Sequence, residues 1–225
     1  MTAQPVPAPR PDRALRPVPQ GVASGAARPL AVDRRGAVHL ARLPWTLPTG
    51  FGELRVRGAA PADLPAVARM HARCSADTLL QRYQRGGQAP PLPVVDELLR
   101  MPLVVVVQTY DGELVAVASG SRPATAPGHT AEPSWVLQLG LLVEDGWQRL
   151  GIGSRLAAHV AASAQLLGHR ELVADVESQG LPMRRVLDAI GPTRATHHLA
   201  GWRVRTRLDV SVLGGLGTVD GVRAG

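Results

Sequence analysis

The stretch Val143-Glu144-Asp145-Gly146-Trp147-Gln148-Arg149-Leu150-Gly151-Ile152-Gly153-Ser154-Arg155-Leu156 decides the fold of this chain. An apolar run leads into a short polar turn, and two glycines then open an apolar-periodic helix that we expect to continue to about Leu167. A glycine has no Cβ, so an anionic group can approach the backbone closely. The first amides of a helix lack intrahelical acceptors, and the helix dipole adds positive charge there. The stretch therefore predicts a phosphate or pyrophosphate site, with Arg149 and Arg155 as counter-charges.

The spacing of the glycines distinguishes between cofactors. A dinucleotide fold needs G-x-G-x-x-G almost directly after its strand. Here Leu156 replaces the third glycine, and seven residues separate Val143 from Gly151. A Walker loop is excluded because the chain contains no lysine. What remains is Q-x-x-G-x-G, formed by Gln148, Gly151 and Gly153. For this motif alone, a tight turn at a glycine-rich helix start is the structural alternative.

The rest of the chain predicts an alternation of strands and helices. The residue patterns indicate a strand at 54–60, helices beginning at Pro61, after Ser75 and over 92–101, a hairpin of 104–109 and 114–119, a strand ending at Val143, the helix after it, a strand at 172–176, a helix at 181–190 and strands at 195–199 and 202–210. Asp111-Gly112 is a favoured hairpin turn pair.

This order of elements, together with the Q-x-x-G-x-G loop, resembles the GNAT superfamily of acyl-CoA-dependent N-acyltransferases over roughly residues 53–210. Three local patterns, residues 75–83, 145–153 and 181–185 before Gly191, are similar to those of bacterial protein-lysine acetyltransferase domains. The resemblance implies an α/β (α+β) fold with a mixed, mostly antiparallel central sheet flanked by helices. It also implies acetyl-CoA, or another acyl-CoA, as co-substrate.

The two ends of the chain differ in composition from its middle. We expect a flexible Pro/Arg/Ala-rich arm over residues 1–52, the acyltransferase domain over 53–210 and a flexible tail over 211–225. The arm carries seven arginines against two aspartates. Such a charge would suit nucleic acid or an acidic partner, but its spread favours a solvated tail. Residues 38–40 and Trp45 could still add a strand or strap to the domain.

Composition excludes several classes of protein. The single cysteine, Cys74, rules out a disulfide framework, and no cluster of residues has metal-ligand spacing, so we expect no metal. No apolar run approaches the roughly 18 residues of a membrane span. We therefore expect a soluble protein in the cytoplasm of a bacterium-like cell, with pairing of the late strands as a route to a dimer.

The resemblance also implies a coenzyme site. Its residues would be the end of the strand before the loop and the loop itself: Leu141, Leu142, Val143, Gln148, Arg149, Leu150, Gly151, Ile152, Gly153 and Ser154. Strand 139–143 would separate from strand 172–176, and the pantetheine arm would bond in the gap as an added strand does. An amide near Leu141 or Leu142 would polarise the thioester carbonyl. A neutral amine would then attack directly, without a covalent enzyme intermediate.

The general base is the open question in this reading. The similar lysine acetyltransferases have a glutamate on the strand before the loop, and its position here is Gln138. A glutamine amide can hold an acceptor or a water but cannot take a proton at neutral pH. Glu177, after strand 172–176, and Tyr83, on the helix that lines the acceptor cleft, are the other catalytic candidates. Their structural alternatives are a solvated strand end and a core tyrosine.

Two functions are compatible with these patterns. The first is an N-acyltransferase that moves an acetyl or other acyl group from acyl-CoA to an amine of a small molecule or protein lysine. The second is a catalytically weak or inactive acyl-CoA-binding domain used as a sensor or interaction module, which Gln138 and the absence of a tyrosine at Leu187 favour. The acceptor is not readable, although few acidic residues line its expected cleft, which disfavours a polycationic acceptor such as an aminoglycoside.

Overall fold

One eight-stranded sheet organises the computed structural model, which describes residues 42–84, 86–125, 130–176, 181–198 and 201–208. The strands are β1 (Trp45–Thr49), β2 (Gly52–Gly58), β3 (Leu103–Gln108), β4 (Leu114–Ser121), β5 (Val136–Val143), β6 (Glu171–Val176), β7 (Thr193–His198) and β8 (Gly201–Arg207). Their order across the sheet is β1-β2-β3-β4-β5-β6-β8-β7. Only β5 and β6 are parallel; the other neighbours are antiparallel. The predicted mixed, mostly antiparallel sheet is confirmed.

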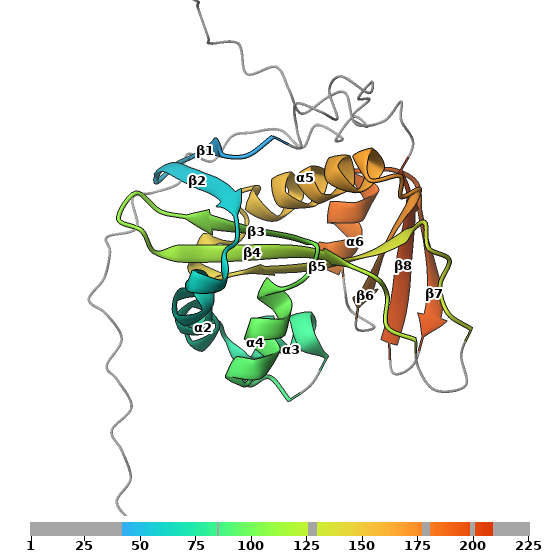
Figure 1. The fold of residues 1–225 in the computed structure, drawn as a ribbon, viewed down its shortest axis with the longest axis horizontal. Coiled ribbons are helices and arrows are strands. Elements are labelled where there is room, and N and C mark those ends of the chain that lie inside the picture. The colour runs from blue at the N-terminus through green and yellow to red at the C-terminus, as the bar shows by residue number, and fades with distance from the viewer. Residues whose placement is uncertain (1–41, 85, 126–129, 177–180, 199–200, 209–225) are drawn as a thin grey trace, which may run out of the picture.

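Helices cover both faces of this sheet (Figure 1). The helices α2 (Leu64–Arg73), α3 (Ala76–Tyr83) and α4 (Leu92–Leu99) lie on one face, and α5 (Ile152–Leu166) and α6 (Leu181–Asp188) lie on the other. Short 3-10 turns, η1 (Pro61–Asp63) and η2 (Asp145–Trp147), precede α2 and α5. Among the described helices, none combines the length and apolar character needed to cross a bilayer.

The alternation of side chains along β5 divides the core in two. Leu137 and Leu139 belong to the larger apolar cluster, which includes α5 residues such as Leu156. Leu142 belongs to the second cluster, with Val67 of α2. Successive strand residues point to opposite faces, so the odd-numbered residues of β5 face α5 and the even-numbered ones face α2–α4. Whether a β5 residue is odd- or even-numbered therefore decides on which face of the sheet its side chain lies.

The sheet begins before residue 53, where we expected the domain to start. Residues 45–49 pair with β2 in full antiparallel register, and Leu47 is completely buried. Trp45 lies against His159 of α5, with ring centroids 6.4 Å apart. Burial of these apolar side chains draws the segment onto the domain. Most of the two expected tails, residues 1–41 and 209–225, lies outside the described residues.

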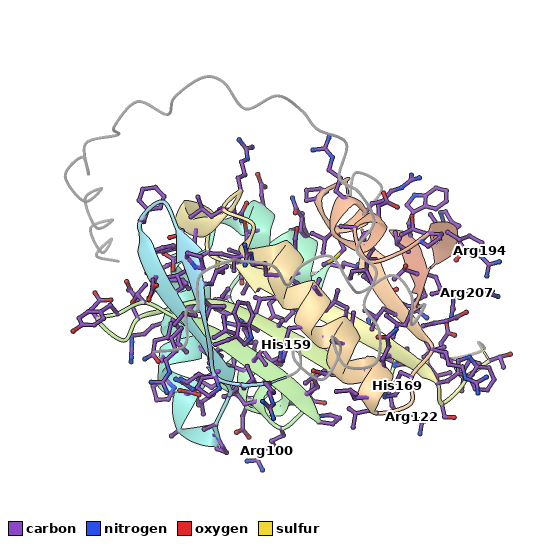
Figure 2. The ribbon with its side chains drawn as sticks, turned by 90° about the horizontal axis from the view of Figure 1, so that it is seen from above. Arg100, Arg122, His159, His169, Arg194 and Arg207 are labelled. Atoms are coloured by element: carbon purple, nitrogen blue, oxygen red, sulfur yellow. The ribbon has the colours of Figure 1, made fainter. Side chains whose placement is uncertain are left out.

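The far end of the sheet is basic at its surface. Arg194 of β7 and Arg207 of β8 project from this end, away from α5 and its buried His159 (Figure 2). Arg205 and Arg203 of β8 are instead drawn onto the sheet by acidic residues. Strand β8 therefore carries both a solvent-exposed arginine, Arg207, and two arginines held in ion pairs, Arg203 and Arg205.

Candidate functional site

The turn between β5 and α5 has two residues in the left-handed conformation. Arg149 has φ 61° and Gly151 has φ 79°, and α5 begins at the next residue, Ile152. Glycine adopts positive φ without steric cost, which explains Gly151. Gly153 has a different reason: a Cβ there would lie 3.2 Å from Leu141 Cδ2. The first glycine therefore shapes the turn, and the second lets α5 lie against β5.

Six consecutive backbone amides in this turn, those of residues 149–154, donate to no other described residue. The first helical bond of α5 runs from Arg155 N to Gly151 O at 3.1 Å. Curled backbone amides at a helix N-terminus form a concavity that suits a phosphate oxygen. Arg149 is exposed, and within the described residues neither it nor Arg155 forms an ion pair. The predicted pyrophosphate loop thus has suitable donors and nearby positive charge.

A set of hydrogen bonds ties this turn to the start of α3. Asp145 accepts from the Ser75 amide at 2.8 Å, from the Ser75 hydroxyl at 2.6 Å and from the Thr78 hydroxyl at 2.8 Å. Although burial raises the pKa of the Asp145 carboxyl, the hydrogen bonds from Ser75 and Thr78 lower it further, so it lies below its usual value. Ser75 Oγ also accepts from Thr78 N, as the predicted helix cap requires.

Gln148 completes this tether. Its Nε2 donates to Thr78 Oγ1 and to Val143 O, each at 3.0 Å. Its backbone amide donates to Asp145 O. Both nitrogens of Gln148 are therefore used inside the protein, so this member of the motif holds the shape of the turn.

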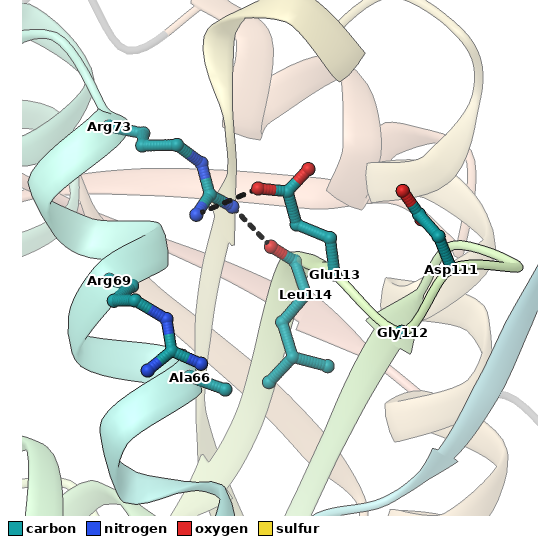
Figure 3. Close-up of a pocket in the computed structure, with 7 residues that line it drawn as sticks. All are labelled: Ala66, Arg69, Arg73, Asp111, Gly112, Glu113 and Leu114. Carbon is teal, nitrogen blue, oxygen red and sulfur yellow. Dashed lines mark hydrogen bonds and ion pairs between the residues drawn. The ribbon is translucent and has the colours of Figure 1, made fainter.

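A polar hollow lies beside the tether, between α2 and the β3–β4 turn (Figure 3). It is lined by Ala66, Arg69, Arg73, Asp111, Gly112, Glu113 and Leu114. Arg73 donates to Leu114 O at 2.7 Å and pairs with Glu113 at 3.2 Å and with Glu144 at 2.8 Å. These contacts hold Glu144, the residue just before Asp145, so Arg73 supports the turn from the α2 side.

The two parallel strands diverge where we expected the pantetheine arm. β5 and β6 pair at only three positions, Val136 with Glu171, Leu137 with Leu172 and Gln138 with Val173. β5 continues to Val143, still paired with β4 on its other side. From residue 139 onward, the edge of β5 that faces β6 has no strand partner among the described residues. This edge leads directly into the glycine turn.

Gln138 lies at the start of the divergence and faces the α2–α4 side. Its Nε2 donates to Asp175 Oδ2 at 3.0 Å. Arg203 holds both oxygens of Asp175, with Nε at 2.6 Å and Nη2 at 2.8 Å. Glu132 bonds to Arg203 at 3.1 Å and to Arg205 at 2.7 Å. The hydrogen bond that Arg203 donates to Asp175 is the main reason that the pKa of Arg203 is raised.

Our sequence reasoning did not find this ionic network. A signal was present, because Glu171 and Asp175 share one face of β6, and every second residue of β8 from Arg203 is an arginine. Only the register, which sets Asp175 opposite Arg203, brings the two patterns together. The network engages the described carboxylate closest to Gln138.

Tyr83 is bonded to His71 of the neighbouring helix. His71 Nδ1 lies 2.7 Å from Val67 O, and Nε2 lies 2.6 Å from the Tyr83 hydroxyl. A carbonyl only accepts, so Nδ1 carries the proton and Nε2 accepts from the phenol. Burial lowers the pKa of His71 and raises that of Tyr83. His71 is thus a buried, packed side chain, and the hydroxyl of Tyr83 donates to it.

Several other candidates have simpler outcomes. Glu177 lies outside the described residues, so the structure says nothing of its position. Burial, followed by the nearby Asp145 and Glu144 carboxylates, raises the pKa of the Cys74 thiol to about 12, which keeps it protonated at neutral pH. Within the part of the chain that the structure describes, no group of His, Cys, Asp and Glu could hold a metal ion.

Comparisons with known proteins identify the family and the fold. The sequence model of the Acetyltransferase (GNAT) family matches residues 76–191. The GNAT domain of S. lividans PAT has 20% identity and a TM-score of 0.64, with 76% of this chain and 98% of that chain covered. A GNAT phosphinothricin acetyltransferase from Sinorhizobium meliloti, solved in complex with acetyl-CoA, has 16% identity and a TM-score of 0.54, with 75% and 95% covered.

A third solved structure has the same fold. YncA from Salmonella typhimurium, solved with its cofactor acetyl-CoA, has 19% identity and a TM-score of 0.52, with 69% of this chain and 94% of that chain covered. At these identities the structural likeness concerns the fold. The family model covers more than half of the sequence, including α3, β5, the glycine turn and α5. The chain therefore belongs to the GNAT family of acetyltransferases.

Proposed function

We propose that this protein is an N-acyltransferase, which moves an acetyl or other acyl group from acyl-CoA to an amine of a small molecule or a protein lysine. One observation carries the proposal: the amides of residues 149–154 donate to no other described residue at the start of α5. These amides follow the part of β5, from residue 139 onward, that is not paired with β6. A phosphate site and a slot for an extended chain would thus follow one another along the backbone.

The coenzyme would use both parts of this arrangement. The amides from Arg149 to Ser154 would hold the pyrophosphate, with Arg149 and Arg155 as counter-charges. Backbone groups of Leu141, Leu142 and Val143 would bond the pantetheine arm as an added strand. Leu150, Gly151, Ile152 and Gly153 would contribute amides, and Gln148 would hold the turn through Thr78 and Val143.

The reaction would be a direct transfer. A neutral amine attacks the thioester carbonyl carbon, the C–N bond forms and the C–S bond breaks, and the thiolate of CoA takes up a proton. An amide near Leu141 or Leu142 would stabilise the oxyanion that forms during attack. Gln138 would orient the acceptor or a water, and Glu177 would receive the proton. Tyr83 would line the acceptor side. Its hydroxyl already donates to His71, so it would not serve in the proton transfer.

The second candidate function is an acyl-CoA-binding sensor or interaction domain with weak or no turnover. A specific observation favours it: the Gln138 amide and both Asp175 oxygens are already bonded. Asp175 is thus engaged by Arg203 and Gln138 and is not free to bind an acceptor amine. Both candidates need the same coenzyme site and differ in turnover.

We also propose a cytoplasmic location, which is a prediction from the sequence. A dimer would form through β7, the outermost strand of the described sheet beyond β8. An edge strand presents unpaired backbone groups to another chain. Light scattering on the purified protein would measure the oligomeric state.

Titration calorimetry of the full chain with acetyl-CoA tests the coenzyme site, using two matched variants. Gly151 and Gly168 flank α5, have φ of 79° and 87°, and would place a Cβ in open space. Gly151→Asp and Gly168→Asp therefore introduce the same charge and similar backbone strain at opposite ends of one helix. We expect Gly151→Asp to lose acetyl-CoA binding and Gly168→Asp to keep it.

The outcomes separate the hypotheses. Equal loss of affinity in both variants would reflect a general effect on α5 and contradict the assignment of the turn. No binding of acetyl-CoA, longer acyl-CoAs or free CoA to the wild-type protein would remove both candidate functions. Binding with acyl-CoA consumption in the presence of amines supports the transferase, and binding without consumption supports the sensor.

A further inference from the structure

Arg82, in the last turn of α3, has its guanidinium packed onto the backbone of β5. A Cβ at Gly140 would lie 2.6 Å from Arg82 Cζ and 2.7 Å from Ser119 Oγ. Arg82 Nη2 donates to that hydroxyl at 3.3 Å. A side chain at position 140 would displace the guanidinium, so the glycine leaves room for it. β5 thus has a glycine, Gly140, at the point where the guanidinium of Arg82 packs against it.

This guanidinium has no carboxylate partner among the described residues. Its Nε is buried and has no hydrogen-bond partner there, and the guanidinium also lies over the Tyr83 ring, 5.1 Å from Cζ to the centroid. Burial lowers the pKa of Arg82. Removing a charge from water without a counter-ion is strongly unfavourable. The last turn of a helix favours a cation, but among the described residues no carboxylate offsets the partial burial of this one.

Arg203 provides the contrast on the same face of the sheet. It is 6% exposed, and it is bonded to the carboxylates of both Asp175 and Glu132. A buried arginine with a purely structural role in this protein is thus neutralised by two acids. Arg82 has one long hydrogen bond to a neutral hydroxyl, which leaves its charge available for an anion from outside the described protein.

The position of Arg82 decides which reactant would bring that anion. Gly140 lies between Gln138 and Leu142 on the face of β5 toward α2–α4, and two residues along a strand span about 7 Å. The proposed coenzyme site is at the N-terminus of α5, on the opposite face. A molecule that reaches Arg82 at the diverging part of β5 would therefore come from the acceptor side.

We propose that Arg82 binds the carboxylate of the acceptor, so that the substrate class is amines that carry a carboxylate close to the amino group, such as free amino acids. This inference rests on the proposed transferase function and names its acceptor. The planar guanidinium suits a carboxylate, which it can bond with two parallel hydrogen bonds. An acceptor without that group would leave the partly buried charge unpaired, which gives discrimination.

The test compares each of a panel of amino acids with its carboxamide, a matched acceptor that lacks only the negative charge. Acetylation from acetyl-CoA is followed by mass spectrometry, with wild type, Arg82→Gln, Arg82→Lys and Arg100→Gln. Arg100 is an exposed arginine of the same helical layer, and among the described residues its ion pair is with Asp96. We expect wild type and Arg100→Gln to prefer the carboxylate by about 100-fold or more in kcat/KM.

In Arg82→Gln the preference should fall to within about threefold, with Arg82→Lys in between, because lysine keeps the charge but not the fork. The Kd for acetyl-CoA should stay within about threefold of wild type in every variant, since Arg82 is not part of the coenzyme site. Circular dichroism verifies folding, and Arg82→Lys keeps the test valid if Arg82→Gln does not fold.

Several outcomes would overturn the proposal and can be told apart. Absence of acetyl-CoA binding in wild type removes the transferase function itself. Binding followed by acetylation that ignores the carboxylate, that is confined to lysine side chains of peptides, or that touches no member of the panel removes the role of Arg82 alone. A preference for succinyl-CoA over acetyl-CoA that Arg82→Gln abolishes would assign the carboxylate to the acyl group instead.

Discussion

Asp145, in the turn after β5, accepts hydrogen bonds from both the amide and the hydroxyl of Ser75, which precedes α3 and lies 70 residues earlier in the chain. Two of the three local sequence patterns, residues 75–83 and 145–153, are therefore one structural unit. The serine caps α3, the aspartate binds the capping residue, and Gln148 bonds to Thr78 in the same helix. The position of the glycine turn thus depends on α3, a helix on the opposite face of the sheet.

The first prediction concerns this link. Asp145→Asn loses the charge that Ser75 and Thr78 stabilise, so unfolding free energy at pH 7 should fall by about 1 kcal/mol, a modest value because Asp145 is exposed. Acetyl-CoA affinity should fall severalfold as the turn loosens. Asp96→Asn, which removes an exposed pair with Arg100, should leave both quantities nearly unchanged. Urea unfolding and calorimetry measure them, and equal effects of the two substitutions would contradict the coupling.

Much of the fold could be predicted from local patterns, because the deciding residues are close in sequence. The helix after Gly151, the cap at Ser75 and the hairpin around Asp111-Gly112 are each set by neighbouring residues. Apolar alternation and apolar runs predicted the remaining strands other than β1 to within a few residues. The reason for Gly153 was not readable, because it depends on how close Leu141 lies in the folded protein.

The rest depends on contacts that no local pattern encodes. β1 joins the sheet because Leu47 finds an apolar cluster made by distant elements. The pairing of Asp175 with Arg203 requires the β6–β8 register. The contact between Arg82 and Gly140 requires the packing of α3 on β5. The candidate coenzyme loop was therefore visible in the sequence, whereas the surroundings of Gln138 were not.

The second prediction concerns the close approach of α5 to β5. Gly153→Val adds a branched side chain where even a Cβ would be 3.2 Å from Leu141. We expect a loss of about 1–3 kcal/mol in unfolding free energy from overpacking, together with weaker acetyl-CoA binding. Gly146→Val, in the same turn but with open space around its Cβ, is the control. Comparable losses in both variants would show that crowding against Leu141 is not the cause.

The third prediction is a pH dependence that comes from His71. Its pKa in the folded state lies below the ordinary value of 6.5, mainly because of burial. As the pH falls, the unfolded chain therefore takes up the proton before the folded protein does. The contribution of neutral His71 to the free energy of unfolding is thus complete above pH 6.5 and is lost as the pH falls through and below that value. Urea midpoints from pH 8 to pH 5 should fall more steeply in wild type than in His71→Gln. His197→Gln, at an exposed histidine, should follow wild type, and a steep fall that persists in His71→Gln would refute the assignment.

The fourth prediction concerns the ionic network. Arg203→Met removes a nearly buried cation and leaves Asp175 and Glu132 without it. We expect a loss of about 2–3 kcal/mol in unfolding free energy, less than for a fully buried pair because both carboxylates retain some contact with water. Adding Asp175→Asn should recover part of the loss. Strictly additive effects of the two substitutions would mean that they do not interact.

The fifth prediction tests whether Gln138 occupies the place of a general base. Gln138→Glu would put a second carboxylate against Asp175, whose Oδ2 now accepts from the Gln138 amide at 3.0 Å. Two carboxylates this close cannot both ionise easily, so one proton of the pair should be held to a raised pKa. A carboxyl group with a raised pKa is a better proton acceptor near neutral pH than an ordinary one. Acetyl transfer should therefore appear or increase at least about tenfold in the variant and rise with pH as the shared proton is lost. Gln138→Met, of similar length but without a hydrogen-bonding amide, controls for mere loss of the bond to Asp175. If Gln138→Glu and Gln138→Met change turnover equally, or if neither changes it, the proton leaves the amine by another route.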